Sequence, residues 1–236
     1  MTRRRWIADE YTSDRAALLG SHAAHLSRTL RVRVGQDFEV ACGDRVRRAT
    51  VSSVADDRVE FALGEEVSVT AALPITLLLA VFKFDRMEWA IEKCTELNVS
   101  TIVPVIARRT EKHLALAAEK RVERWRRIAR EASEQSRRLS PPEIAAPMKL
   151  ADALTAGSAL RLVLAEIERE AALIEVLRSH PGIESLTLAI GPEGGWTPEE
   201  LQSFATSQWI PVSLGDTILR AETAAIAALA IARGEL

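Results

Sequence analysis

Gly191-Pro192-Glu193-Gly194-Gly195-Trp196 and Leu214-Gly215-Asp216-Thr217-Ile218-Leu219-Arg220-Ala221-Glu222-Thr223-Ala224 are the two stretches that decide the fold. Each follows an apolar run that reads as a buried strand, and each opens into a helical pattern. The sequence therefore places two glycine loops at the carboxyl ends of two strands, where open α/β sheets bind ligands. Glycine there lets the backbone approach a ligand closely. Either loop alone is equally compatible with an ordinary turn, but the two together favour a binding site.

From Leu73 onward, apolar runs and helical patterns alternate along the chain. Such alternation predicts a mostly parallel sheet with helices on both faces. Asp85 is the expected N-cap of the first of these helices. The predicted strands are Ile75–Phe82, Ser100–Ile106, a strand near Ile144, Leu160–Ala165, Leu186–Ile190 and Trp209–Leu214. The predicted helices are Asp85–Leu97, Leu116–Arg138, a short helix near Ala151, Ala171–Arg178, Pro198–Ala205 and an alanine-rich helix at the C-terminus.

Residues 1–70 have a different pattern, in which short β-rich runs are separated by turn residues. We expect a helix over Asp14–Thr29 followed by strands at Arg31–Val34, Asp37–Ala41, Arg45–Val54 and Arg58–Leu63. Half-buried alternation in these runs predicts a small antiparallel barrel. The domain boundary is expected between Glu66 and Pro74, which leaves 73–236 as the second domain.

Composition limits the possible classes of protein. The chain has 236 residues, 47% of them hydrophobic, which is ample for a sizeable core. Its two cysteines, Cys42 and Cys94, form no CxxC pattern and no histidine cluster accompanies them, which argues against disulfides and a metal site and favours a reducing cytoplasm. The basic start lacks an apolar segment, so we expect no signal peptide. The apolar stretch Leu73–Phe82 is too short to span a membrane.

Positive charge is concentrated in one segment although the net charge is −2. Residues 108–138 hold 11 basic and 5 acidic side chains, whereas residues 139–236 hold 6 and 13. Localised positive charge attracts phosphate even when the whole chain is nearly neutral. Arginines also recur among the N-terminal strands. The alternative is a solvated surface with internal ion pairs, and residue spacing alone does not decide between the two.

Common nucleotide motifs are missing from the sequence. No GxxxxGK[ST] pattern occurs, and no GxGxxG follows the first strand of the α/β region, so neither a P-loop nor a dinucleotide site is predicted. An adenosine cofactor without a long phosphate chain needs apolar walls and close backbone approach instead. Leucine and isoleucine side chains beside the glycine loops provide such walls, although core packing is their other ordinary role.

The two loops resemble the cofactor loops of the SPOUT methyltransferases, and more closely those of the 16S rRNA uridine-N3 methyltransferase family (RsmE-like). That family carries Ile-Gly-Pro-Glu-Gly-Gly followed by Leu-Gly-x-x-Ile-Leu-Arg-x-Glu-Thr-Ala. The resemblance extends to Glu92–Val99, Arg109-Thr110, Arg124-Trp125, Glu134-Gln135-Ser136 and Arg28–Gly35. The chain departs from the family pattern at Asp216-Thr217, where a Pro/Ser-Arg pair is usual, at Ala221, where Thr is common, and at Arg137, where Gly is common.

The resemblance implies a C-terminal domain with a deep trefoil knot that binds S-adenosylmethionine, and an N-terminal PUA-like barrel that binds RNA. It implies methylation of N3 of one specific uridine in 16S rRNA, with the small ribosomal subunit or its assembly intermediate as partner. The implied cofactor-binding residues are Leu164, Ile190, Gly191, Glu193, Gly194, Gly195, Leu214, Gly215, Ile218, Leu219 and Thr223. The implied RNA-binding residues are Arg28, Arg31, Arg33, Arg109 and Arg137. No membrane and no metal are expected.

Arg220 and Glu222 are the candidate catalytic residues. A guanidinium stays protonated, so Arg220 cannot be the base and is expected to orient the RNA or stabilise developing negative charge. Glu222 is a possible base or orienting group, or simply a partner of the helix dipole. Glu193 and Thr223 are expected to fix the loops by hydrogen bonding. Positioning is expected to supply most of the acceleration.

Other functions remain open at this point. Another SPOUT enzyme, acting on a ribose 2′-hydroxyl or on tRNA, is the nearest alternative, and a non-catalytic RNA-binding protein is the alternative from a different class. Related knotted enzymes are dimers. The helical segment from Ala221 to Ala232 is apolar on nearly every side, so we expect it to form a homodimer interface. Arg109 of one subunit would then serve RNA at its partner's cofactor. Burial of the helix within its own subunit is the competing account.

Overall fold

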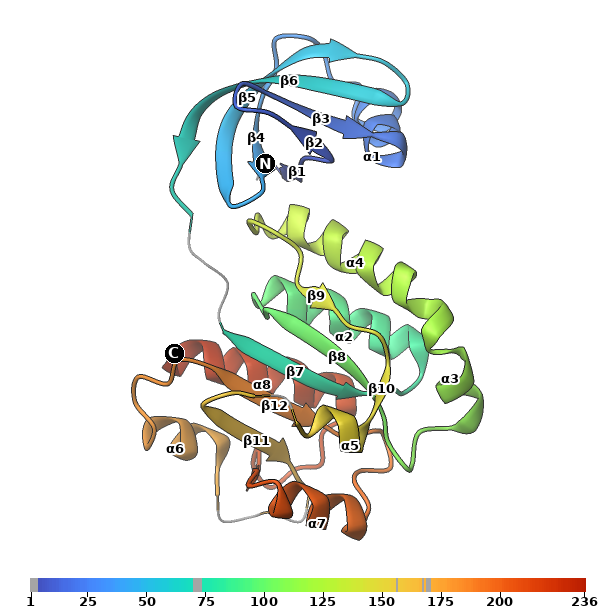
Figure 1. The fold of residues 1–236 in the computed structure, drawn as a ribbon, viewed down its shortest axis with the longest axis vertical. Coiled ribbons are helices and arrows are strands. Elements are labelled where there is room, and N and C mark those ends of the chain that lie inside the picture. The colour runs from blue at the N-terminus through green and yellow to red at the C-terminus, as the bar shows by residue number, and fades with distance from the viewer. Residues whose placement is uncertain (1–3, 70–73, 156, 167, 169–170) are drawn as a thin grey trace. The chain divides into compact units, whose positions relative to one another are not determined.

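The computed structural model describes residues 4–69, 74–155, 157–166, 168 and 171–236. The chain forms two compact units (Figure 1). The N-terminal unit comprises Met1–Ala72 and Arg130–Ser140, and the C-terminal unit comprises Leu73–Ala129 and Pro141–Leu236. The expected boundary between Glu66 and Pro74 includes residues 70–73, which lie outside the described residues. The sequence pattern did not indicate that residues 130–140 belong with the N-terminal unit.

The N-terminal unit is built on a curled sheet of six strands (Figure 1). Its spatial order is β1-β4-β5-β6-β3-β2, and all neighbours are antiparallel except β1 and β4. Trp6, Leu18, Val40 and Phe61 are fully covered and form the centre of its core. The strands are β1 (Arg5–Ile7), β2 (Glu10–Tyr11), β3 (Arg15–Leu19), β4 (Asp37–Cys42), β5 (Arg45–Val54) and β6 (Arg58–Val67).

The prediction of one helix over Asp14–Thr29 was wrong. Its first part is strand β3, which pairs with β6 and buries Ala16 and Leu18. Gly20, with φ of 53°, then turns the chain into α1 (Gly20–Ala24) and a π-helical turn over His25–Thr29. The predicted strand Arg31–Val34 is also wrong, because Arg31 has a left-handed backbone (φ 51°) and a turn follows it. The parallel pairing of β1 corrects the expectation of a purely antiparallel sheet.

The C-terminal unit contains a seven-stranded sheet in which every pairing is parallel. Its spatial order is β10-β8-β7-β12-β11-β13, and β9 pairs with β8. These pairings confirm the predicted parallel sheet. Its strands are β7 (Ile75–Ala80), β8 (Thr101–Ile106), β9 (Glu143–Ile144), β10 (Met148–Lys149), β11 (Leu160–Leu164), β12 (Leu186–Ile190) and β13 (Ile210–Val212).

Helices cover both faces of this sheet, as predicted. Alternate residues of β7 enter two cores: Leu77 and Leu79 pack in one, and Leu78 and Ala80 in the other. The first core contains α2 (Phe84–Glu96), α6 (Leu173–Arg178), α8 (Ala221–Glu235) and the start of α4 (Val122–Gln135), and the second contains α5 (Leu150–Ala153) and α7 (Pro198–Thr206). Among the described residues, no helix is long and apolar enough to cross a membrane.

Two helix predictions need correction. The long helix expected over Leu116–Arg138 is three pieces: α3 (Lys112–Ala117), a 3-10 turn at Glu119–Arg121, and α4. Asp85 is not an N-cap but lies within the first turn of α2, whose N-cap is Lys83. A carboxylate in the first turn still interacts favourably with the helix dipole, so the residue acts through the dipole rather than through a capping bond.

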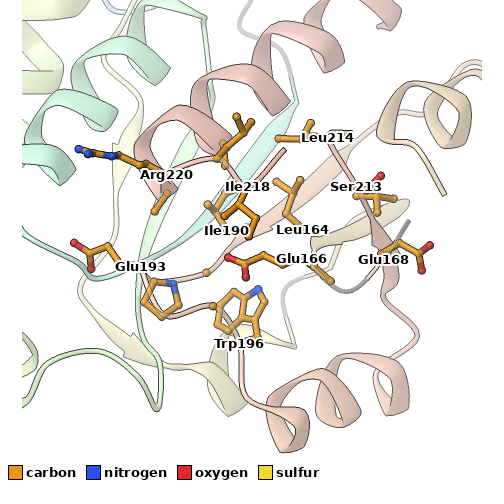
Figure 2. Close-up of a pocket in the computed structure, with 18 of the residues that line it drawn as sticks. Leu164, Glu166, Glu168, Ile190, Glu193, Trp196, Ser213, Leu214, Ile218 and Arg220 are labelled. Carbon is orange, nitrogen blue, oxygen red and sulfur yellow. The ribbon is translucent and has the colours of Figure 1, made fainter. Parts of the chain in front are cut away.

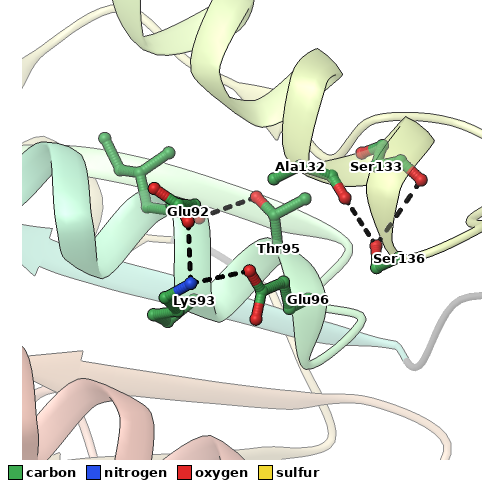
Figure 3. Close-up of polar contacts among 8 residues, drawn as sticks. Glu92, Lys93, Thr95, Glu96, Ala132, Ser133 and Ser136 are labelled. Carbon is green, nitrogen blue, oxygen red and sulfur yellow. Dashed lines mark hydrogen bonds and ion pairs between the residues drawn. The ribbon is translucent and has the colours of Figure 1, made fainter.

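Polar residues of the Glu92–Val99 and Glu134–Ser136 motifs make local bonds (Figure 3). Lys93 Nζ lies 2.7 Å from Glu92 Oε1 and 2.8 Å from Glu96 Oε1, and these bonds raise the pKa of Lys93. Within α2, Thr95 Oγ1 donates to the Ile91 carbonyl at 2.7 Å, and at the end of α4 Ser136 Oγ donates to the Ala132 carbonyl at 2.7 Å. These bonds stabilise the last turns of the two helices.

Candidate active site

A cavity of about 780 Å³ opens at the carboxyl ends of β11, β12 and β13 (Figure 2). Residues of three loops line it: 164–166 and 168 after β11, 190–193, 195 and 196 after β12, and 212–220 after β13. β11 lies between β12 and β13 in the sheet, so the three loops are neighbours. The two glycine loops singled out in the sequence therefore meet in one site, at the sheet edge where parallel α/β folds bind ligands.

Apolar side chains form the wall between the loops. Leu164, Ile190, Leu214 and Ile218 all line the cavity, and Figure 2 shows them grouped together. Ile218 is 80% exposed, which places it at the rim. An apolar wall of this kind suits a ring such as adenine, with the nearby backbone available for directional hydrogen bonds.

The first glycine loop needs its glycines for different reasons. Gly195 has φ of 68°, and a Cβ there would lie 3.6 Å from the Glu166 carboxyl carbon. A Cβ at Gly191 would lie 3.3 Å from Trp196 Nε1. The Trp196 ring packs edge-on against Phe204 of the following helix, with ring centroids 4.9 Å apart, and this contact supports the loop. Trp196 Nε1 is buried and has no hydrogen-bond partner among the described residues.

A capping box at the start of α7 holds this loop in place. The Glu200 backbone N–H donates to Thr197 Oγ1 at 3.3 Å, and the Thr197 N–H donates to Glu200 Oε2 at 2.8 Å. The other oxygen, Glu200 Oε1, accepts from the Arg108 N–H at 2.8 Å. Arg109 donates to the Gly194 carbonyl and, at 3.4 Å, to that of Trp196. The loop after β8 is thus fastened to the loop after β12.

Arg220 is the N-cap residue of α8 and lines the cavity. Two residues later, Glu222 is 7% exposed and is not among the residues that line the cavity. Its Oε1 lies 3.8 Å from Nε of Arg86, a cavity residue on α2. Its Oε2 is buried without a hydrogen-bond partner among the described residues. Glu222 therefore contacts the site through Arg86.

Charge is unevenly distributed around the cavity. Arg220 and Glu193 lie at one side of it in Figure 2, Glu168 at the opposite side, and Glu166 between them. Glu168 Oε1 accepts from the Ala171 N–H at 3.0 Å, which closes the loop after β11. Carboxylates therefore lie on both sides of the cavity, and Arg220 adds a positive charge on one of them. The sequence pattern had not indicated Glu166, Glu168 or Arg86.

Most of the expected cofactor residues line this cavity, and two do not. Thr223 is exposed on α8, and Gly194 lies beneath Arg109, whose Cδ would be 3.3 Å from an added Cβ. Arg109 itself lines the cavity of its own chain, and its expected role at a partner's cofactor stays a prediction. The expected residues that line it are Leu164, Ile190, Gly191, Glu193, Gly195, Leu214, Gly215, Ile218, Leu219 and Arg220.

The remaining arginines expected to bind RNA lie in the N-terminal unit. Arg31 and Arg33 are exposed. Arg28 forms an exposed ion pair with Asp56 at 2.9 Å, and Arg137 pairs with Glu39. An arginine in an exposed pair can still exchange its partner for a phosphate, because such pairs contribute little free energy.

The cavity fits an adenosine cofactor that carries a sulfonium. Its volume lies in the range of small-molecule sites, its wall is apolar, and glycines permit close backbone approach. Carboxylates of Glu166, Glu168 and Asp216 line the same space and would balance positive charge on the ligand. Among the described residues there is no group of His, Cys, Asp or Glu that could hold a metal ion.

The sequence matches a family of known proteins. The sequence-family model for the RNA methyltransferase domain matches residues 70–233 of this chain. Ribosomal RNA small subunit methyltransferase E from Synechocystis is 33% identical over 95% of this chain and 75% of its own length, and that from Rickettsia conorii is 32% identical over 92% and 88%.

Solved structures give the same relationship. The structure of ribosomal RNA small subunit methyltransferase E from Neisseria gonorrhoeae, bound to S-adenosylmethionine, is 30% identical to this chain and has a TM-score of 0.87. The match covers 97% of this chain and 95% of that one. A protein from Legionella pneumophila in complex with the same cofactor is 28% identical with a TM-score of 0.88, covering 99% of this chain and 98% of its own. Because the relatives match in sequence over most of the chain and in fold, this chain belongs to the ribosomal RNA small subunit methyltransferase E family.

Proposed function

We propose that this protein transfers the methyl group of S-adenosylmethionine to N3 of one specific uridine in 16S rRNA of the small ribosomal subunit. The cavity at the ends of β11, β12 and β13 is the observation that carries the proposal, because two glycine loops and an apolar wall meet there. Membership of the methyltransferase E family supports the reaction and the class of RNA. The sequence resemblance supports the uridine N3 atom as the acceptor.

The residues of the cavity would have different roles in the reaction. When bound, the cofactor supplies an electrophilic methyl group. Leu164, Ile190 and Leu214 would hold the adenine ring, and Glu166 and Glu168, which line the same cavity, would pair with positive charge on the ligand. A guanidinium has hydrogen-bond donors and no acceptor, so the role of Arg220 would be to orient the acceptor and to stabilise negative charge.

The proposal extends to the rest of the molecule. The N-terminal unit would be a PUA-like module that binds the RNA through Arg28, Arg31, Arg33 and Arg137. The loops after β12 and β13 would belong to a trefoil knot, and two chains would form a homodimer in the cytoplasm, where they meet the small subunit or its assembly intermediate. The curled sheet of the N-terminal unit and its exposed arginines support the first of these proposals.

Mass spectrometry of the modified RNA tests the reaction. Small subunits from a strain that lacks the gene are incubated with protein and cofactor, and nucleosides are then identified. We expect N3-methyluridine at one position. A ribose-methylated nucleoside, or methylated tRNA only, would instead support another branch of the superfamily, and cofactor binding without any product would support a non-catalytic RNA-binding protein.

Calorimetry tests the cofactor site. Replacing Gly195, which has φ of 68°, with alanine strains the loop by about 1–2 kcal/mol, so we expect roughly tenfold weaker cofactor binding. The matched control is Gly157→Ala, because an added Cβ there meets nothing within 4 Å and the backbone is not left-handed. Unchanged affinity in a folded Gly195→Ala protein would remove this loop from the site.

Salt dependence tests the RNA-binding arginines. Phosphate contacts release counterions, so affinity for 16S rRNA should fall steeply as salt rises. Reversing the charge of Arg31 and Arg33 should weaken RNA binding, reduce that salt dependence and leave cofactor affinity unchanged. A flat response to salt would show that these exposed arginines do not contact phosphate.

A further inference from the structure

Arg86 is a cavity residue with an unfavourable local position. It is the third residue of α2, and it lines the cavity together with Arg220. The amino end of a helix carries partial positive charge, so a cation in the first turn is disfavoured. Its side chain is also only 31% exposed, which reduces the compensation it obtains from water. Something else must stabilise a guanidinium in this place.

Glu222 provides that compensation. Its side chain is 9% exposed, and its Oε1 lies 3.8 Å from Arg86 Nε. Among the described residues this is the only ion pair of Arg86, and Glu222 Oε2 has no hydrogen-bond partner. α2 and α8 pack in one core through Met87, Ile91 and Leu229, so the two helices that carry the pair are held against each other. Removing either partner would leave the other charge largely buried and uncompensated.

From this arrangement we infer that Arg86 is a second arginine of the acceptor site, which with Arg220 stabilises the negative charge that develops on the uracil ring, and that Glu222 is its positioning residue. The inference rests on the proposed function. Neither arginine can accept the proton, because a guanidinium stays protonated. Glu222 does not reach the cavity, so it acts through Arg86.

The reaction requires this charge stabilisation. The N3–H proton passes to water, which leaves a negative charge spread over N3, O2 and O4 of the ring. The N3 lone pair forms a bond to the methyl carbon while the carbon–sulfur bond breaks, and its electron pair remains on sulfur, which becomes a neutral thioether. Two guanidinium groups that line one partly enclosed cavity would lower the free energy of the anion before and during transfer.

Two other roles for Arg86 give different results in experiments. If it bound a phosphate beside the target, its loss would raise KM for RNA and reduce the salt dependence of binding, without changing how kcat depends on pH. If the pair served only to hold α2 against α8, its loss would lower the melting temperature while the pH profile kept its position.

The pH dependence of kcat, measured at saturating cofactor and RNA, is the decisive test. In wild type, kcat should rise with pH until the bound uridine is ionised. In Arg86→Gln we expect kcat near neutral pH to fall on the order of a hundredfold. Its rising limb should move to higher pH, with unchanged cofactor affinity by calorimetry. Arg86→Lys retains the charge and should recover part of the lost kcat and part of the pH shift.

Arg178→Gln is the control. It removes the Arg178–Glu235 ion pair at the other end of α8 and should behave as wild type.

A double-mutant cycle tests the role of Glu222. Glu222→Gln should lower kcat in the wild-type background but have little further effect in Arg86→Gln, because one residue acts through the other. Equal losses in both backgrounds, or a pH profile that does not move in Arg86→Gln, would overturn the inference. Failure of the proposed function is distinguishable, because wild type would then form no N3-methyluridine at all.

Discussion

Arg137 has a left-handed backbone, with φ of 61°, at a position where the resemblance leads one to expect glycine. Holding a residue with a Cβ in this region costs roughly 1 kcal/mol. Its guanidinium pairs with Glu39, to which Arg5 also donates at 2.7 Å. Burial alone would raise the pKa of Glu39, but the hydrogen bonds from Arg137 and Arg5 bring it below its ordinary value. The side chain thus offsets part of the cost of its own backbone.

The cost of this backbone can be measured with two variants. Arg137→Gly and Arg137→Ala both remove the pair with Glu39, but only alanine retains a Cβ at positive φ. We expect the glycine variant to be more stable than the alanine variant by about 1 kcal/mol in urea denaturation. Equal stabilities would mean that the turn relaxes to a different backbone once the arginine is lost.

Glu134 gives a pH-dependent contribution to stability. It is 2% exposed, and burial raises its pKa to about 7, against the opposing effect of Arg130. A raised carboxyl pKa stabilises the folded state below the ordinary value of 4.5, and this stability is lost as pH rises through about 7. Wild type should lose about 2–3 kcal/mol between pH 5 and pH 8 from this group. Glu134→Gln should remove that loss and so be less dependent on pH. An identical pH dependence in both proteins would show that Glu134 stays ionised.

Residues near the glycine motifs could be predicted from the sequence, whereas their distant partners could not. Arg220 and Gly195 follow directly from the motifs and line the cavity. Glu200 was not indicated, because its bond to the Arg108 N–H joins residues 92 positions apart. Arg86 likewise reaches the site only because α2 packs beside α8. Thr223 belongs to the motif but is exposed to solvent, because Ala221 and Glu222 occupy the buried side of the first turn of α8.

At the scale of elements, the strength of the apolar pattern decided which predictions succeeded. β7, β8, β11 and β12 are buried on both faces, so their apolar runs are unbroken and easily recognised. β1, β2 and β10 have only two or three residues, too few to show a period. β3 was mistaken for helix because alanine and leucine favour helices, and its pairing with β6 outweighs that preference.

The start of α7 should control the first glycine loop. Glu200 is 4% exposed and bonds to both Thr197 and Arg108, so Glu200→Ala leaves two partly buried N–H groups without this acceptor. We expect a loss of about 2–4 kcal/mol in stability and weaker cofactor binding. Thr197→Ala, which removes only the cap, should cost about 1 kcal/mol. The neighbouring Glu199→Ala is the control for charge. Unchanged cofactor binding in Glu200→Ala would show that the loop keeps its shape without this support.

At the scale of the molecule, the arginines of the basic segment 108–138 are less available to bind phosphate than the charge of the segment suggests. Arg121 and Arg124 both pair with Glu88, at 3.7 and 2.6 Å, and Arg126 pairs with Glu123 at 2.6 Å. Farther along, Arg130 pairs with Asp9 at 2.9 Å in the N-terminal unit. The sequence could show the surplus of charge but not its partners, because most of the acids lie in other segments. Any RNA contact of this segment would therefore have to compete with existing ion pairs.

Association of two chains is the remaining prediction at this scale, and the exposed face of α8 is where we place it. Ala225, Ala228, Leu229 and Ala232 are buried in their own unit, so part of the apolar helix is already explained without a partner. Small residues nevertheless remain on the outer side of the helix, where they would let a second helix approach closely, namely Thr223, Ala230 and Gly234. A bulky cation at this face would prevent such close packing without disturbing the core.

Sedimentation at micromolar concentration measures this association. We expect wild type to be a dimer and Ala230→Arg to be a monomer with an unchanged melting temperature. Ala151→Arg places the same side chain on an exposed alanine of α5 and should leave the dimer intact. If wild type sediments as a monomer and still methylates RNA, the helix serves only its own unit and each cavity is complete within one chain. If Ala230→Arg remains a dimer, the interface lies elsewhere, since a long charged side chain cannot be accommodated between two closely packed helices.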